Sequence, residues 1–247
     1  MLIPKEMQAV IYRNGQLALA SVPVPDIEPD GVLLKVLNVG FCGSDHSLVK
    51  SGGLAEDTIL GHEVCGQVVA CGAEVRGVAM GARFIVRPTF CGNCRDCRAG
   101  RPYFCQTGRR SIGIGDMPGA FAAYVKVYPD MLIPVPDAVD SRNAALAEAF
   151  AAALHGINCL TVHEGPVLVV GGGPIGLATV GLLKIMGVAP IVLSEPVAEK
   201  RSLARDLGAD HTLDPFKDEM GKKVFELVDV ARRFAATRRA FSLPLLR

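Results

Sequence analysis

Four cysteines fall within a fifteen-residue stretch of this 247-residue chain, in the spacing C-x2-C-x2-C-x7-C; they are Cys91, Cys94, Cys97 and Cys105. Thiolates at this spacing suit the closed tetrahedral shell of a structural zinc ion, because the short gaps let backbone turns present successive sulfurs to one metal. An iron–sulfur cluster can begin with the same C-x2-C-x2-C pattern, but its bacterial form has a last gap of three residues rather than seven. Unbound cysteines are the third interpretation. The spacing favours structural zinc, so this segment should fold as a compact metal-bound lobe.

The whole chain has eight cysteines, and the beginning of the sequence shows no basic segment followed by an apolar one. We therefore expect no secretory signal, a cytoplasmic location, and cysteines that bind metal rather than form disulfides. The formal net charge is +1, which predicts no nucleic-acid or membrane partner. Residues 165–183 are uncharged and long enough to imitate a membrane span, but they contain six glycines and two prolines. A strand, a turn and a helix explain them better.

A second group of possible metal ligands lies upstream of the cysteine quartet. A catalytic zinc needs three protein ligands and an open position, and Cys42 and His62 would supply two of them. The third would be a carboxylate, either Glu63 or Glu148. Asp45 is placed to accept the other ring N–H of His62. The remaining cysteines are expected to be small buried hydrophobic residues: Cys65, Cys71 and Cys159.

A glycine-rich loop follows an apolar strand at 166–170 and reads Gly171-Gly172-Gly173-Pro174-Ile175-Gly176. In a dinucleotide-binding loop of this pattern the first glycine forms the tight turn, the second admits the pyrophosphate, and the third lets helix and strand pack closely. Glu195 lies nineteen residues beyond Gly176, where an acid can bind the ribose diol of NAD and repel the extra phosphate of NADP. Because Arg201 could bind the extra phosphate, NADP is the less favoured alternative cofactor.

The order of predicted elements indicates an α/β chain of two domains. Residues 1–140 are β-rich, with short strand-like runs at 9–12, 32–36, 64–69, 83–86 and 123–127. A helix is predicted over 141–160, with an apolar stripe of Leu146, Phe150 and Leu154. Strands at 166–170 and 191–193 and helices at 174–186 and 198–207 then predict parallel βαβ units.

Several motifs give the chain its resemblance to a known family: Gly40-Phe41-Cys42-Gly43-Ser44-Asp45, Gly61-His62-Glu63, the cysteine quartet and the glycine loop. With these motifs it resembles the zinc-dependent medium-chain alcohol dehydrogenases, in particular the polyol and threonine dehydrogenase branch. The resemblance implies a GroES-like catalytic domain over 1–148 and a doubly wound parallel (Rossmann) domain over 149–229. It also implies one catalytic and one structural zinc, a nicotinamide cofactor, and a small secondary alcohol or polyol as substrate. Ser44 would pass the hydroxyl proton toward solvent.

The chain departs from the family pattern at several places. A relay histidine often stands five residues after the zinc cysteine, and that position is Ser47 here. His46, one residue early, is the candidate for this catalytic relay. Glu148 is followed by Ala149 where the family often has proline. The basic segment 230–247 is expected to be a non-family tail, with a basic amphipathic helix as the alternative.

The Rossmann domain is also expected to be partial, because only 83 residues remain from Gly165 onward, too few for two βαβαβ halves. We predict a zinc-dependent oxidoreductase that moves hydride between an alcohol and a nicotinamide cofactor. The alternative is an inactive dehydrogenase that keeps only its zinc sites. A homo-oligomer of the family type is possible, with its interface expected in the part of the fold that this chain lacks.

Overall fold

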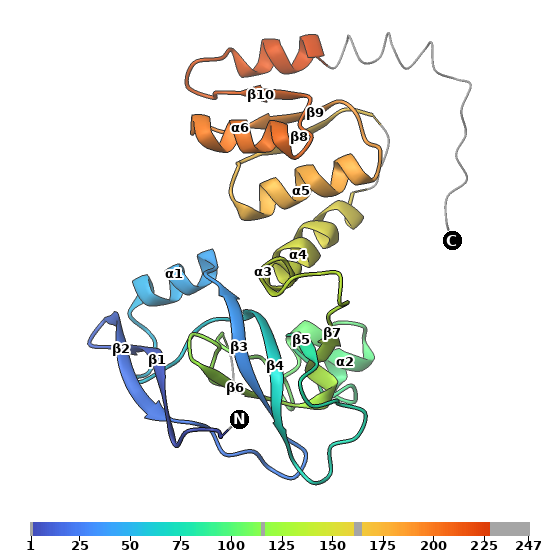
Figure 1. Cartoon of the computed structure of the whole chain (residues 1–247). Helices are drawn as coiled ribbons and strands as arrows, with labels where there is room; N and C mark the ends of the chain where they lie inside the picture. The colour runs from blue at the N-terminus through green and yellow to red at the C-terminus, as the bar shows by residue number, and fades with distance from the viewer. Residues whose placement is uncertain (1, 115–116, 161–164, 228–247) are drawn as a thin grey trace. The chain divides into compact units, whose positions relative to one another are not determined.

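The computed structural model describes residues 2–114, 117–160 and 165–227. The chain divides into two compact units, Met1–Glu148 and Ala149–Arg247. Figure 1 shows the strand-rich first unit and the alternation of strands and helices in the second. Because 228–247 lie outside the described residues, nothing in the structure bears on the prediction for the basic segment.

The first unit is built on a five-stranded antiparallel sheet and a separate hairpin. The sheet has the order β6-β3-β4-β5-β7, and the hairpin pairs β1 with β2. The strands are β1 (Glu6–Arg13), β2 (Gln16–Pro23), β3 (Val32–Gly40), β4 (Glu63–Cys71), β5 (Arg83–Val86), β6 (Tyr124–Val127) and β7 (Leu132–Pro134). Asn14 and Gly15 form the hairpin turn with φ of 52° and 81°, the left-handed values that such a two-residue turn requires.

Alternating apolar side chains of the sheet form the core of this unit. Val32 and Leu34 of β3 are fully buried, as is Val127 of β6, and Val64 and Val68 of β4 join the same cluster. Residues two apart on a strand face the same side of the sheet, so these positions make one continuous apolar layer. That layer holds β3 and β4 in register, and the ends of these two strands carry the candidate metal ligands.

Short helices connect the strands of the first unit. They are α1 (Gly43–Ser51), α2 (Arg95–Arg98), η1 (Pro102–Phe104), η2 (Pro129–Met131) and α3 (Ser141–Ala145). Helix α1 ends at Gly52, whose φ of 68° gives a left-handed C-cap. The helix therefore starts shortly after β3 and stops within nine residues.

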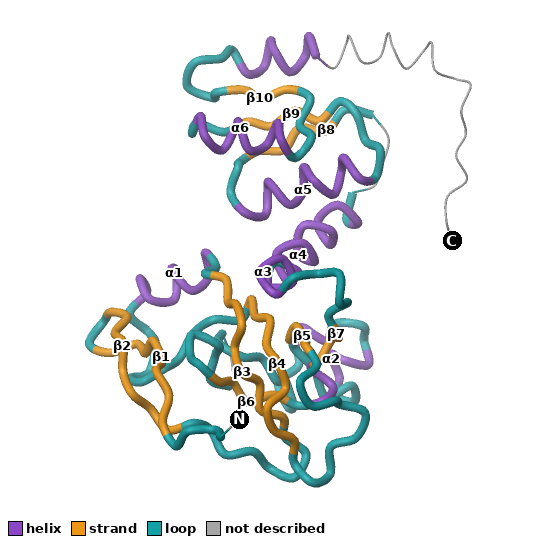
Figure 2. Tube along the Cα trace, in the orientation of Figure 1, coloured by secondary structure: helices purple, strands orange, loops and turns teal. Residues whose placement is uncertain are grey.

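The second unit contains a three-stranded parallel sheet in the order β10-β9-β8. Its elements are α4 (Ala147–Asn158, which begins in the first unit), β8 (Val167–Val170), α5 (Pro174–Ile185), β9 (Ile191–Ser194), α6 (Ala198–Asp206) and β10 (His211–Leu213). Figure 2 shows the strands and helices alternating along this part of the chain. Val180 and Leu183 of α5 pack with Ile191 and Leu193 of β9 in one apolar cluster. This is the parallel βαβ arrangement that the sequence predicts.

The structure corrects the expectations for the helix at 141–160. That helix is interrupted at Leu146, which caps α3 before α4 begins. The predicted apolar stripe is exposed, and α4 instead buries Ala149, Ala153 and Ile157. Small side chains allow closer packing on that face. Side-chain size, rather than the spacing of apolar residues, therefore determines which face of α4 is buried.

The three cysteines outside the predicted metal sites differ in burial. Cys65 is buried as expected, and Cys71 is partly buried. Cys159 is exposed, so the expectation of a buried residue is wrong there. Its place near the end of α4 gives it a solvent-facing position that its residue type does not indicate.

In the described part of the chain, no helix combines the length and the apolar character needed to cross a membrane. The uncharged stretch 165–183 contains strand β8, the glycine loop and most of α5.

Candidate zinc and cofactor sites

The first candidate site forms where β3 ends, α1 begins and β4 begins. Cys42 is the N-cap of α1, and His62 directly precedes β4, whose first residue is Glu63. One ligand atom from each of these three residues lies within 4.8 Å of the others. Zinc bonds of about 2.0–2.3 Å place ligand atoms somewhat closer together than this, so small adjustments would complete a shell. The set of a thiol, an imidazole and a carboxylate fits a zinc ion with an open position.

Asp45 supports this site from within α1. It is fully buried, and its Oδ2 accepts a hydrogen bond of 2.9 Å from the backbone N–H of Cys42. Its Oδ1 lies 3.5 Å from Nδ1 of His62, and neither of these two buried atoms has a hydrogen-bond partner among the described residues. A buried carboxylate directed at one imidazole nitrogen is the usual companion of a metal on the other nitrogen. The pair therefore fits a cation at Nε2 of His62.

The pKa values of the site reflect the same electrostatics. Burial acts to lower the pKa of His62, but its interactions with Asp45 and Cys42 outweigh burial and raise that pKa to about 9. Burial raises the pKa of Glu63; a hydrogen bond with Cys42 opposes this, and the charge of nearby Glu148 adds to it. The negative surroundings that hold a proton on His62 would also attract a cation, which binds the neutral imidazole in place of that proton.

Glycine at position 40 makes room for the Glu63 carboxylate, a contribution that the sequence pattern does not reveal. Gly40 pairs with Glu63 between β3 and β4. A Cβ at Gly40 would overlap Oε2 of Glu63. The only signal in the sequence is that a glycine lies two residues before Cys42. Such a glycine is common at the end of a strand, so its role is visible only once the pairing of β3 with β4 is known.

The other predicted residues of this region differ in how near they lie to the ligand cluster. Ser44 Oγ lies 3.5 Å from Nε2 of His62. Glu148 is exposed and lies near enough to Glu63 to affect its pKa, but it is not in the cluster of three ligand atoms. His46 is exposed on α1, where its backbone N–H donates to the carbonyl of Cys42 at 3.3 Å.

The position of the family's relay histidine is also described. Ser47 is exposed on α1, and its hydroxyl donates a hydrogen bond of 3.0 Å to the carbonyl of Gly43. That bond is local to the helix, so it ties the hydroxyl to the backbone of the first turn rather than to the ligand cluster.

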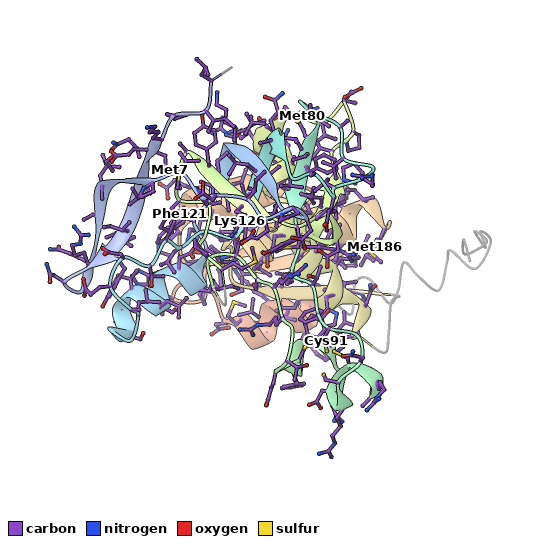
Figure 3. All side chains as sticks on the ribbon, turned by 90° about the horizontal axis from the view of Figure 1, so that it is seen from below. Met7, Met80, Cys91, Phe121, Lys126 and Met186 are labelled. Atoms are coloured by element: carbon purple, nitrogen blue, oxygen red, sulfur yellow. The ribbon has the colours of Figure 1, made fainter. Side chains whose placement is uncertain are left out.

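The cysteine quartet forms the second candidate site, and all four sulfurs lie within 4.8 Å of one another. Sγ of Cys91 lies 3.8 Å from Sγ of Cys97 and 3.5 Å from Sγ of Cys105. A tetrahedral zinc with bonds of about 2.3 Å requires sulfurs about 3.8 Å apart. An iron–sulfur cluster would place several atoms between the sulfurs and hold them further apart, so the spacing fits one ion. Figure 3 labels Cys91 on the segment that leads into α2.

Hydrogen bonds prepare the quartet for negative charge. Thr107 Oγ1 and the backbone N–H of Cys94 donate to Sγ of Cys91, at 3.2 Å and 3.3 Å. The Thr107 bond, followed by backbone bonds, lowers the pKa of Cys91 to about 6. Desolvation, followed by its bond with Cys94, raises the pKa of Cys97 to about 12. Four thiols this close cannot all ionise unless a cation lies between them.

The glycine loop joins β8 to α5, and two of its positions, Gly171 and Gly176, favour glycine on geometric grounds. Gly171 has φ of 99°, a value that favours glycine. Gly173 is the N-cap of α5, and Pro174 and the half-exposed Ile175 follow it in the first turn. A Cβ at Gly176 would overlap the carbonyl oxygen of Gly171. The loop thus leads directly into the N-terminus of α5, and a helix N-terminus can bind phosphate through its first backbone N–H groups.

Glu195 lies beside this loop, immediately after β9. Its Oε2 accepts a hydrogen bond of 2.7 Å from the backbone N–H of Gly172, and its Oε1 accepts one of 2.9 Å from Val197. These bonds, with that from Val197 the larger influence, lower the pKa of Glu195. A charged carboxylate is therefore fixed within reach of the phosphate loop.

Arg201 is held by the protein itself. Its Nη1 donates to the carbonyls of Glu195 and Pro196, at 2.6 Å and 2.7 Å, and lies 3.3 Å from Oδ2 of Asp214. Sequence reasoning misses Asp214, because no local pattern connects it to Arg201.

Comparisons with known proteins agree with this fold. The family model for the alcohol dehydrogenase GroES-like domain matches residues 28–137, and the model for zinc-binding dehydrogenases matches residues 174–242. The second match extends into the basic segment 230–247.

The chain is 32% identical to an L-threonine 3-dehydrogenase of Stenotrophomonas maltophilia (strain K279a), over 96% of this chain and 72% of that protein. It is 31% identical to a sorbitol dehydrogenase of Bacillus subtilis (strain 168), over 86% of this chain and 62% of that protein. A zinc-binding dehydrogenase from Sinorhizobium meliloti 1021, whose crystal structure contains NADP, matches with a TM-score of 0.81 and 37% identity. That match covers 88% of this chain and 64% of the other.

The chain belongs to the zinc-dependent medium-chain alcohol dehydrogenase family. It spans 62% of the length of the sorbitol dehydrogenase that it matches.

Proposed function

We propose that this chain binds two zinc ions and NAD, and that it oxidises a small secondary alcohol or polyol to the ketone. The observation that carries the proposal is the cluster of Cys42, His62 and Glu63 beside the buried Asp45 carboxylate. The reaction removes a hydride from the carbinol carbon and a proton from the hydroxyl, and it yields a carbonyl compound, reduced cofactor and a proton. When bound, zinc supplies Lewis-acid stabilisation of the alcohol oxygen, and the nicotinamide supplies the hydride acceptor.

The residues of the chain take distinct parts in this proposal. Cys42, His62 and Glu63 would hold the ion of the open site, with Glu63 preferred to Glu148 because only Glu63 lies in the cluster. Asp45 orients the His62 ring. The Ser44 hydroxyl lies 3.5 Å from Nε2 of His62, which supports its role in passing the substrate proton toward solvent. The quartet would hold the second ion in a closed shell.

NAD is preferred to NADP because of the surroundings of Glu195. A carboxylate there can accept hydrogen bonds from a ribose diol and repels a phosphate. Arg201, the cation that could favour a phosphate, is held by backbone carbonyls and Asp214. The related structure from Sinorhizobium meliloti contains NADP, so turnover should be measured with both NAD and NADP.

We infer a cytoplasmic location, where clustered cysteines bind metal rather than form disulfides. The described residues provide no observation that favours the inactive alternative.

Metal analysis and turnover together test the proposal. We expect two zinc ions per purified chain and the formation of reduced cofactor from NAD with at least one member of a panel of secondary alcohols and polyols. Glu63→Gln should remove one zinc, whereas Glu148→Gln should retain both. One zinc in the unaltered chain, or no turnover with either cofactor, would contradict it.

A further inference from the structure

Strand β3 contains a β-bulge close to its end. Val36 pairs with Gly66 on β4, but the neighbouring residue of β4, Cys65, pairs with Asn38. Leu37 is therefore an extra residue on β3. Because successive side chains of a strand point to opposite faces, an extra residue changes the face on which every later side chain lies. The bulge therefore sets the orientation of the last residues of β3.

The two faces of β3 after the bulge differ in what they contact. Val36 and Val39 both pack against the apolar core of the first unit, although residues three apart on a regular strand face opposite sides. Asn38 and Gly40 consequently lie on the other face, and there Gly40 pairs with Glu63. The bulge therefore keeps Asn38 out of the apolar core and puts it on the same face as Glu63.

Helix α3 packs against the face that carries Asn38. The helix lies against β3 and β4 (Figure 1), and Ala144 and Ala145 form an apolar cluster with Cys65. Ser141, the first residue of α3, donates a hydrogen bond of 2.7 Å from Oγ to Oδ1 of Asn38. This bond fastens the start of α3 to the strand that leads to the metal ligands.

A second anchor holds the turn that precedes α3. Nη1 of Arg83 donates to the carbonyl of Val139 at 2.7 Å. Nη2 of the same side chain donates to the carbonyls of Pro136 and Asp137, at 3.2 Å and 3.3 Å. This anchor comes from β5 and does not involve Asn38, so α3 should stay on the sheet when the Asn38 bond is lost.

The end of α3 leads to the second carboxylate of this region. Leu146 caps α3, and Glu148 lies in the first turn of α4. The charge of Glu148 acts on Glu63. Asn38 is therefore connected to both carboxylates, to Glu63 through the neighbouring strand pairs and to Glu148 through α3.

We propose that Asn38 is a positioning residue of the open metal site: its bond with Ser141 holds the end of β3 and the start of α3 together, and this arrangement gives the site its full affinity for zinc. This inference rests on the proposed function, because it concerns the metal site of the same reaction. The three ligands remain those named above, and Asn38 acts through the elements that carry them. Asparagine is disfavoured inside strands, so its place in this mostly apolar strand is explained by the bond that it accepts.

Zinc titrations in the presence of a competing chelator test the proposal, because they report metal affinity rather than turnover. The binding step that is absent in Cys42→Ser identifies the open site. Asn38→Ala and Ser141→Ala should each weaken that step about tenfold, the lower end of the effect of removing an outer hydrogen-bond partner. Since both remove the same bond, the double variant should bind no more weakly than either. Ser141→Thr keeps the hydroxyl and should bind as the unaltered chain does.

Two controls separate positioning from stability. Ser21→Ala removes an exposed hydrogen bond of 2.7 Å to Oε2 of Glu6 in the hairpin, and it should leave zinc affinity unchanged. Asn38→Ala should melt close to Ser21→Ala and keep the zinc of the quartet, because Arg83 still anchors the turn before α3.

The outcomes distinguish this inference from the proposed function. Two zinc ions bound with equal affinity by Asn38→Ala and the unaltered chain would overturn the inference and leave the function standing. A lower melting temperature with unchanged zinc affinity would also overturn it, because the bond would then only stabilise the fold. Weaker binding in the variants of a chain that shows no turnover would support the inference and count against the function. A single zinc ion in the unaltered chain would contradict both.

Discussion

The two candidate metal sites of the first unit gather their side chains in different ways. The quartet takes all four sulfurs from one fifteen-residue segment, and short turns bring them together. The other site takes Cys42 from the start of α1 and His62 with Glu63 from the start of β4, so the pairing of β3 with β4 brings them together. The comparison teaches that one segment can supply all four ligands of a closed zinc shell. Ligands gathered by strand pairing can instead supply three, which leaves one coordination position open for substrate.

The largest difference between the two sites is expected when one ligand is removed from each. Cys42→Ser should reduce zinc from two ions to one and lower kcat/KM by about 10³-fold or more, because metal stabilisation of the alcohol oxygen is worth several kcal/mol. The melting temperature should change little. Elemental analysis, steady-state kinetics and calorimetry measure the three quantities. A variant with two zinc ions and ordinary turnover would break the assignment of Cys42.

Cys97→Ser should show the opposite pattern. It should also reduce zinc to one ion, but with a fall in melting temperature of about 5 °C or more, because structural metal binding contributes folding free energy. Cys159→Ser is the matched control, since Cys159 is exposed and belongs to neither cluster. Equal stability of Cys97→Ser and the control would show that the quartet does not hold the lobe together.

A smaller change tests how the sheet prepares the open site. Gly40→Ala places a methyl group where the Glu63 carboxylate lies, so it should lower kcat/KM about 10- to 100-fold. The quartet should keep its zinc. Gly156→Ala is the control, because a Cβ at Gly156 meets nothing within 4 Å. Unchanged kinetics in Gly40→Ala would mean that Glu63 does not need this space.

The same difference between local and distant signals explains what the sequence can predict. The runs around β8, α5, β9 and α6 are apolar or periodic stretches separated by glycine or charged residues, and the predicted elements lie close to the observed ones. Sequence patterns do not predict helix α1, because it buries only Asp45 and has no apolar stripe. Its position depends on the Cys42 and Asp45 cap. The roles of Gly40 and Asp214 depend on strand pairing and on an ion pair, which no local pattern records.

The acid beside the glycine loop gives the smallest expected effect. Hydrogen bonds from Val197 and Gly172 lower the pKa of Glu195 below its ordinary value of 4.5. A carboxyl whose pKa is lower in the folded chain contributes stability above that ordinary value and loses it as the pH falls through the folded pKa. Glu195→Gln should therefore melt at a lower temperature than the unaltered chain near neutral pH, and the difference should shrink as the pH falls below 4.5.

Calorimetry across this pH range measures the difference, with Glu199→Gln on the first turn of α6 as the exposed control. A difference that stays constant with pH would show that the Glu195 charge does not secure the loop. The geometry of the loop would then be set by its own residues, as it is in the quartet. It would not depend on a contact between distant segments, as the site of Cys42, His62 and Glu63 does.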